Sequence, residues 1–188
     1  MGDLFLDSAR SLVRINTFAE GVLARLAHDL DLECRSLEGT ATTATDGATT
    51  GSARVNAPLS GMSVRGTLGK DGRLDQRALS AGDRQNIVSK MRQQVFQAGA
   101  EAVVRVEAHL RGGSARVRVV PPNGKAVETV MRPTVRIDGE SLHATGTFEL
   151  SLSAIGSDAI KGPMGAFRMK DRVRISFEIV FAPPGQPA

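Results

Sequence analysis

The sequence has no tryptophan and no tyrosine, and its aromatic residues, 4% of 188, are all phenylalanine. Proteins that bind single-stranded nucleic acid stack its bases on aromatic side chains, and this chain has very few aromatic side chains for such stacking. The net charge of +4 comes without a run of basic residues that would resemble a nucleic-acid tail. We therefore predict no nucleic-acid partner and an interior built mainly from Val, Leu, Ile and Ala.

Cysteine and histidine are also scarce. Cys34 is the single cysteine and shares the apolar face of its segment, which predicts a small buried residue. The three histidines lie far apart in sequence, without the spacing of a zinc site. His109 and His143 occupy polar positions of alternating segments, which predicts a surface location. There is no G-x-S-x-G nucleophile motif either, so we predict no metal, no cofactor, no catalytic residue and no enzymatic activity.

No apolar run approaches the roughly 20 residues of a membrane-spanning helix. The first residues also lack the basic and then apolar arrangement of a secretory signal. We expect one domain over residues 1–188, cytoplasmic as the sequence stands and periplasmic if a signal peptide was removed. One alternating face carries basic side chains that would permit weak contact with a membrane surface, although a solvated exterior is favoured: Arg168, Lys170, Arg172 and Arg174.

What the sequence does contain is strict alternation of apolar and polar residues, the pattern of strands with one buried face. It is clearest in the ranges 142–153 and 172–181, and about eight segments show it in all. We predict an all-β fold whose strands close into a barrel, with a β-sandwich as the alternative. Long strands, few large aromatics, and Ala and Gly at inward positions favour a barrel with a hollow interior.

One segment changes to the period of a helix. Ile87, Met91 and Val95 follow one another at intervals of four residues, and Ser80-x-x-Asp83 resembles a capping box, although Asp83 could itself be the N-cap. Gly99 is the predicted C-cap. We predict one amphipathic helix over about 83–98, covering an opening or an edge of the sheet. The segment near 21–26 would also permit a short helical turn.

The histidine of the segment 26–34 is an unexpected member of an apolar row. His28 lies on the same face as Leu30 and Leu32, whereas Asp29 and Asp31 lie on the opposite face. At the beginning of a strand, His28 can make one hydrogen bond near the mouth of a barrel. We expect its partner to be a buried backbone carbonyl or, as the less favoured alternative, the polar group of a bound molecule. A role as catalytic acid or base is the least favoured hypothesis.

Three stretches of the sequence, in the order in which they follow one another, resemble a known family. They are G-V-L-A-R-L-A-H-D-L at 21–30, L-S-A-G-D-R-Q-N-I-V-S-K-M-R-Q-Q-V-F at 79–96 and F-R-M-K-D-R-V-R-I-S-F-E-I at 167–179. Together they resemble the YceI-like family, lipocalin-like proteins that bind polyisoprenoids and related amphiphiles. The resemblance implies an extended eight-stranded antiparallel lipocalin-like barrel, a helix near one end and an apolar tunnel.

The resemblance also implies a function: binding, carriage or sequestration of a long-chain apolar amphiphile, such as an isoprenoid quinone, a polyprenol or a fatty-acid-like lipid. The alternative is a packed barrel that acts as a protein-interaction or scaffold module without a lipid. A homodimer is compatible with both. If a lipid is bound, we expect it to contact interior residues from several strands and from the helix: His28, Leu30, Leu32, Met62, Val64, Ile87, Met91, Val106, Phe148, Leu150, Leu152, Ile175 and Phe177.

Overall fold

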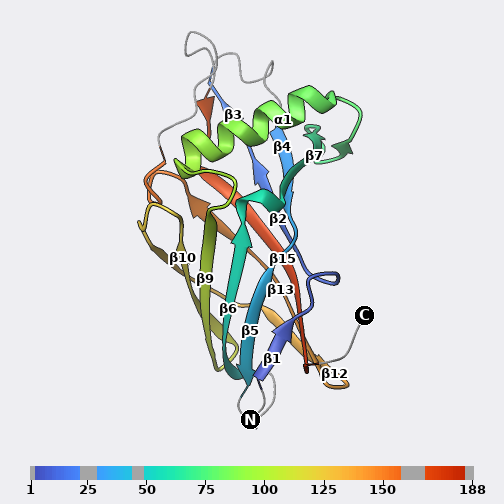
Figure 1. Ribbon diagram of the computed structural model, residues 1–188, viewed down its shortest axis with the longest axis vertical. Coiled ribbons are helices and arrows are strands. Elements are labelled where there is room, and N and C mark those ends of the chain that lie inside the picture. The colour runs from blue at the N-terminus through green and yellow to red at the C-terminus, as the bar shows by residue number, and fades with distance from the viewer. Residues whose placement is uncertain (1–2, 22–28, 44–48, 158–167, 185–188) are drawn as a thin grey trace.

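Antiparallel strands dominate the computed structural model, which describes residues 3–21, 29–43, 49–157 and 168–184 (Figure 1). The strands are β1 (Asp3–Leu6), β2 (Leu12–Thr17), β3 (Ala19–Glu20), β4 (Asp29–Cys34), β5 (Glu38–Thr43), β6 (Thr50–Pro58), β7 (Met62–Leu68), β8 (Leu74–Asp75), β9 (Val103–Arg111), β10 (Ser114–Val120), β11 (Val127–Met131), β12 (Thr134–Asp138), β13 (Ser141–Ser151), β14 (Arg168–Met169) and β15 (Arg172–Ala182). Except for the short pair β3 and β14, all of them belong to one sheet.

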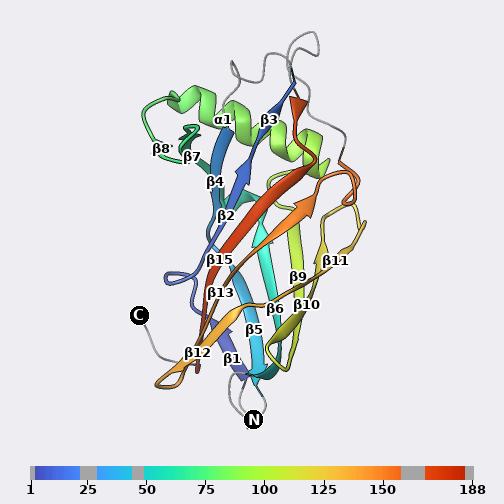
Figure 2. The ribbon, with the colours of Figure 1, turned by 180° about the vertical axis from the view of Figure 1, so that it is seen from behind.

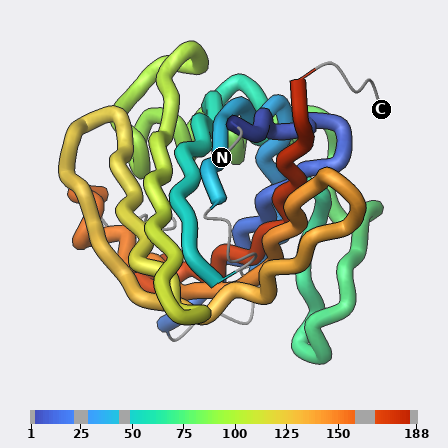
Figure 3. Tube along the Cα trace, turned by 90° about the horizontal axis from the view of Figure 1, so that it is seen from below, coloured from blue at the N-terminus to red at the C-terminus, as the bar shows by residue number. Residues whose placement is uncertain are grey.

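The sheet divides at β15 into two arms. One edge of β15 pairs with β13, from Leu142 opposite Phe181 to Ser151 opposite Arg172. The other edge pairs first with β2 and then with β1. The first arm continues through β4, β7 and β8, and the second through β5, β6, β9, β10 and β11. The sheet curls into a half-barrel, and Figure 3 looks along it. The short strand β12 directly follows β11 in the chain and pairs with β13. The end of the second arm is thereby connected back to β13, which lies beside β15 (Figure 2).

The predicted all-β class with one main helix is confirmed, but the predicted count of eight strands is wrong. The main sheet has 13 strands. The reason is that long alternating segments are interrupted where the chain changes partner. The stretch 127–138 forms two strands, because β11 pairs with β10 whereas β12 pairs with β13. The short strands β1, β5 and β8 also join the main sheet and raise the count.

The helix α1 (Ala81–Lys90) lies across one end of the barrel and continues as a π-helical turn over Met91–Phe96 (Figure 1). It begins two residues before the predicted 83, because Ser80 is the N-cap. The Ser80 hydroxyl accepts from the Asp83 N–H at 3.1 Å, and the Asp83 carboxylate accepts from the Ser80 N–H at 3.0 Å. Hydrogen bonds from the Ser80 hydroxyl and N–H lower the pKa of Asp83.

The C-terminal end of this helical segment also differs from the prediction. The C-cap is Gln97, in the left-handed conformation at φ 51°, and its N–H bonds to the Arg92 carbonyl. Gly99, the predicted C-cap, follows two residues later. The short turn that the sequence permitted near 21–26 falls mainly in 22–28, outside the described residues. Among the described residues, no helix is both long and apolar enough to span a membrane.

Two arginines attach the helix to the sheet. The Arg84 guanidinium donates to the carbonyl oxygens of Val64 at 2.5 Å and Arg65 at 2.6 Å, and to that of Gln76. In the π-helical turn, Arg92 donates to the Leu59 carbonyl from both Nε and Nη2, at 3.1 and 2.7 Å. These bonds satisfy carbonyls near the end of β6 and along β7, and thereby fix the position of the helix over the end of the barrel.

A polar cluster occupies the outer face of β2, β4 and β7. Asp31 is only 4% exposed, and its carboxylate accepts from Asn16 Nδ2 and from Arg65 Nη1, each at 2.8 Å. Asp29 accepts from the Ala19 N–H at 2.8 Å. Leu30 and Leu32 on the same strand pack inward. The predicted division of this strand into an apolar inner face and a polar outer face is therefore confirmed for the described residues.

Candidate functional site

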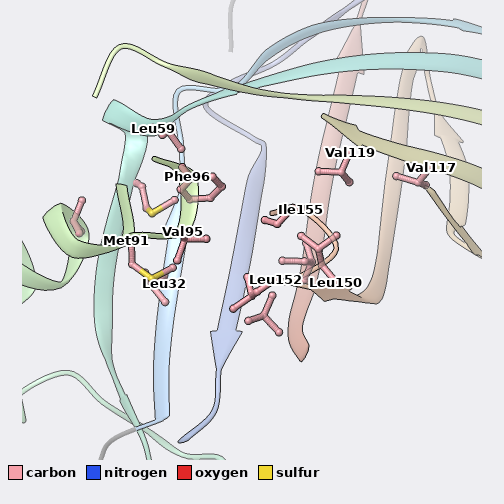
Figure 4. Packing of buried hydrophobic residues seen from close by; sticks show 14 of the residues in the cluster. Leu32, Leu59, Met91, Val95, Phe96, Val117, Val119, Leu150, Leu152 and Ile155 are labelled. Carbon is pink, nitrogen blue, oxygen red and sulfur yellow. The ribbon is translucent and has the colours of Figure 1, made fainter. Parts of the chain in front are cut away.

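The interior has two zones along the barrel, and the zone beside the helix is closed. Leu32, Leu59, Met91, Val95 and Ile155 are each at most 4% exposed. Figure 4 shows the side chains from the helical segment gathered with those of β4, β10, β13 and the turn that follows β13. Interiors packed in this way leave no room for a ligand unless side chains move. This zone holds the helix on the sheet.

The other zone, away from the helix, contains a cavity of about 170 Å³. Its walls come from both arms of the sheet and from β12 and β13. Its lining residues are Val13, Ala41, Thr42, Thr43, Thr50, Gly51, Ser52, Ala53, Val55, Val106, Ala108, Leu110, Ala115, Val117, Met131, Pro133, Val135, Leu142, Ala144, Phe148, Ile175, Phe177, Ile179 and Phe181. An apolar cavity of about 150 Å³ in another protein stays dry and binds benzene, so this one is large enough for an apolar ligand.

The strand register shows where the cavity ends on the helix side. Phe148 and Ile175 are opposite one another on β13 and β15, and both line the cavity. The next inward pair toward the helix, Leu150 and Val173, does not line it and is 8% and 2% exposed. On β9, Val106 lines the cavity while Val104 packs against the closed core. The hollow zone therefore stops at the level of Phe148 and Ile175.

Small side chains create the hollow. Ala41, Ala53 and Ala108 lie opposite one another on the neighbouring strands β5, β6 and β9, and all three line the cavity. Three adjacent strands thus contribute only methyl groups at this level. Large residues at the same positions would fill the space, as they do near the helix. The row of alanines is therefore the local reason that the barrel is not packed solid.

Phe148 and Phe177 form the aromatic part of the lining. Their ring centroids are 6.5 Å apart, with an angle of 57° between the rings. Both side chains belong to the interior but are only partly buried, because they face the cavity. Gly146 on β13 makes room for Phe177 and Met131: a Cβ there would lie 2.4 Å from Met131 Cε and 2.8 Å from Phe177 Cζ. Because residue 146 has no side chain, the Phe177 ring can pack directly against the backbone of β13.

The chemistry of the lining is uniform. None of the described lining residues carries a charge. Its hydroxyl-bearing residues, Thr42, Thr43, Thr50 and Ser52, all come from β5 and β6 near the end of the barrel opposite the helix (Figure 1). Thr42 Oγ1 and Ser52 Oγ bond to each other at 2.8 Å. Because Ala41 and Ala53 face the cavity, the hydroxyls of their neighbours Thr42 and Ser52 point to the outer face. The cavity surface is therefore almost entirely apolar, which suits an uncharged apolar chain.

The residues predicted to contact a ligand divide between the two zones. Val106, Phe148, Ile175 and Phe177 line the cavity. His28 lies outside the described residues. The others belong to the closed zone near the helix: Leu30, Leu32, Met62, Val64, Ile87, Met91, Leu150 and Leu152. Contact with a ligand stays a prediction for all of them. Sequence reasoning noted small residues on inward faces but did not identify the alanine row, because pairing between strands decides which alanines meet.

Other candidate groups behave as structural or surface residues. Cys34 is 4% exposed, and burial raises the pKa of its thiol to about 11, so it is a buried small residue as predicted. His109 is exposed, and His143 is half-buried, with its Nε2 3.2 Å from Arg10 Nη2. Within the described ranges, no three His, Cys, Asp or Glu side chains form a group that could hold a metal ion.

The predicted basic face is also exposed, and its side chains already have partners. Arg168 pairs with Glu20 at 2.5 Å, and Arg172 pairs with Glu149 at 3.3 Å. Lys170 Nζ and Arg174 Cζ lie 5.9 and 5.7 Å from the centre of the Phe18 ring. Weak contact of this face with a membrane surface stays a prediction.

Comparison with known proteins relates the fold to a solved structure. A crystal structure of BcnA from Burkholderia cenocepacia superposes with a TM-score of 0.63, over 93% of this chain and 98% of that chain, at 15% sequence identity. No family model matches the sequence, and no curated protein is significantly similar to it in sequence. At this identity the likeness concerns the fold alone. It agrees with a lipocalin-like all-β architecture for the present chain.

Proposed function

We propose that this protein binds an amphiphile whose apolar chain occupies the cavity, and that it carries or sequesters this molecule. The cavity carries the proposal: it is apolar, it lies inside the sheet, and none of its described lining residues is charged. A protein that only needed a stable barrel would gain from filling this space, because voids in a core reduce stability. The hollow interior thus favours ligand binding over a packed scaffold module.

The size of the hydrophobic effect makes such binding feasible without a strong polar anchor. Each methylene group transferred from water contributes about 0.8 kcal/mol. Ten methylene groups would therefore contribute about 8 kcal/mol, which corresponds to roughly micromolar affinity before the costs of ordering the ligand. A polar head group at the end near Thr43 would remain close to water. Isoprenoid quinones, polyprenols and fatty-acid-like lipids all have the required apolar chain.

In this proposal the protein binds its ligand and does not transform it. The described lining residues offer no carboxylate, imidazole, amine or thiol that could act as acid, base or nucleophile. Among the lining residues that the structure describes, only threonine and serine carry a functional group, and none of these residues is a base. We therefore propose a binding protein rather than an enzyme, without a cofactor beyond the bound lipid.

Native mass spectrometry of the protein, purified without added lipid, tests the proposal directly. We expect a population heavier than the 19.9 kDa chain, and an organic extract that contains a compound of the matching mass difference. Protein stripped by extraction and refolded should then bind the uncharged fluorescent probe N-phenyl-1-naphthylamine. Protein without a bound compound that also fails to take up the probe would rule the function out.

A further inference from the structure

We propose that Phe148, together with Ile175, sets the longest apolar chain that the cavity accepts, at about ten to twelve carbon atoms. This inference rests on the proposed function and adds the size class of the ligand. Longer chains would keep the excess outside the cavity. The two residues are thus determinants of specificity.

The first observation is the abrupt change at one level of the barrel. Phe148 and Ile175 line the cavity, although Ile175 is also buried, whereas the neighbouring inward pair, Leu150 and Val173, does not line it. Beyond that pair, Leu152 and Ile155 pack with residues of the helical segment, and Ile155 is 1% exposed. A chain could pass this level only by separating the helix from the sheet.

The second observation is the short distance along β13 over which residues line the cavity. The lining residues extend from Leu142 to Phe148, a rise of about 20 Å at roughly 3.3 Å per residue. Barrel strands tilt by about 35–45°, so the distance along the axis is about 15 Å. A staggered carbon chain with bonds of about 1.5 Å advances about 1.3 Å per bond, so about twelve carbons reach from end to end. The volume of about 170 Å³ is close to that of a cavity that holds one benzene, so twelve carbons are an upper limit and a long isoprenoid does not fit.

The third observation identifies Phe148 as the side chain that limits the cavity. The Phe148 ring is only partly buried, and its centroid lies 6.5 Å from the centroid of the Phe177 ring. The two rings therefore lie together at the end of the cavity nearest the helix. Removing the Phe148 ring would extend the hollow toward Leu150, two residues along β13. That step is about 7 Å along the strand and about 5 Å along the axis, enough for about four more carbons.

Displacement of N-phenyl-1-naphthylamine by saturated primary alcohols of increasing length tests this inference. In the unmodified protein we expect affinity to rise about fourfold for each added methylene and to level off at about ten to twelve carbons. In Phe148→Ala the plateau should move about four carbons further. Phe5, which is 47% exposed on β1, supplies the matched control, and Phe5→Ala should keep the original plateau.

The outcomes separate the two proposals. Affinity that rises without a plateau to sixteen carbons would keep the binding function and overturn the length limit. An unchanged plateau in Phe148→Ala would overturn the role of this residue. Absence of binding for every alcohol and for the probe would overturn both proposals. If Phe148→Ala does not fold, as judged by circular dichroism, Ile175→Ala is used for the same measurement and must lengthen the accepted chain.

Discussion

At the scale of single residues, the interior changes from packed to hollow through side-chain size. Near the helix, Leu150 and Val173 meet across β13 and β15 and close the core. At the other end, Ala53 and Ala108 meet across β6 and β9 and leave space. The backbone is the same kind of antiparallel ladder in both places. The identity of a few inward residues therefore decides where a ligand can be held.

Cys34 illustrates how burial changes the chemistry of a residue in this core. Burial raises the pKa of its thiol from 9.0 to about 11. Below pH 9 the thiol is protonated in both the folded and the unfolded chain, so its contribution to stability is fully present. Between pH 9 and about 11 only the unfolded chain releases the proton, and the free energy of unfolding should fall across this window.

Urea unfolding at a series of pH values from 8 to 11 measures this effect. Cys34→Ala removes the thiol, so its free energy of unfolding should fall less steeply with pH than that of the unmodified protein. Only the difference in slope is compared, because loss of the sulfur atom also lowers stability at every pH. Equal slopes would show that the thiol ionises equally well in the folded protein.

At the scale of elements, the helical segment closes one end of the barrel through two kinds of contact. Met91 and Val95 pack into the core, and Arg84 and Arg92 donate to backbone carbonyls of the sheet. The capping box at Ser80 begins the helix at the position where Arg84 reaches β7. The position of the helix is therefore specified by hydrogen bonds as well as by apolar contact.

Replacement of Arg84 tests the contribution of these bonds. Arg84→Met keeps an apolar stem but removes the donors to the carbonyls of Val64, Arg65 and Gln76. Hydrogen bonds that involve a charged group contribute about 1.5–3 kcal/mol, so we expect the free energy of unfolding to fall by about 2 kcal/mol. Amide hydrogen exchange in β7 should become faster.

The matched control is Lys90→Met, which alters an exposed residue of the same helix. It should leave both the free energy of unfolding and the exchange of β7 nearly unchanged. If Arg84→Met and Lys90→Met were equally stable, the carbonyl contacts would contribute nothing measurable, and apolar packing alone would hold the helix.

At the scale of the whole molecule, the barrel combines a stable end with a hollow end. The closed core beside the helix supplies tight packing, whereas the cavity represents apolar surface that is not in contact with protein. A hollow of this kind reduces stability in the absence of a ligand, and a bound ligand restores it by mass action. Stability and binding should therefore change in opposite directions when the cavity is filled by mutation.

Ala108→Leu places a larger side chain in the cavity. Three added carbon atoms would bury apolar surface with a contribution of at most about 2.4 kcal/mol. We expect a higher Tm for the ligand-free protein and at least tenfold weaker binding of N-phenyl-1-naphthylamine. The exposed Ala126→Leu should change neither quantity. A lower Tm with binding intact would show that residue 108 does not project into free space.

Local patterns in the sequence predicted much of the architecture. Alternation at 142–153 and 172–181 predicted β13 and β15, which pair from Leu142 opposite Phe181 to Ser151 opposite Arg172. The helix was predicted within a few residues, and its ends differed because hydrogen bonds at Ser80 and the left-handed Gln97 determine them. The predicted count of eight strands was wrong because the stretch 127–138 changes partners midway and because short strands such as β5 join the sheet. Both depend on residues far away in the chain.

Inward and outward faces follow from the period of two alone, because it is a property of every strand. The sequence by itself therefore determined that the chain builds a curled sheet with an apolar interior. Only the tertiary structure decided where that interior is hollow. Register between distant strands brings Ala41, Ala53 and Ala108 to one level, and Phe148 and Ile175 to another. Pairing between strands that are distant in sequence brings these residues together. No local pattern could therefore show that the cavity lies at the end opposite the helix.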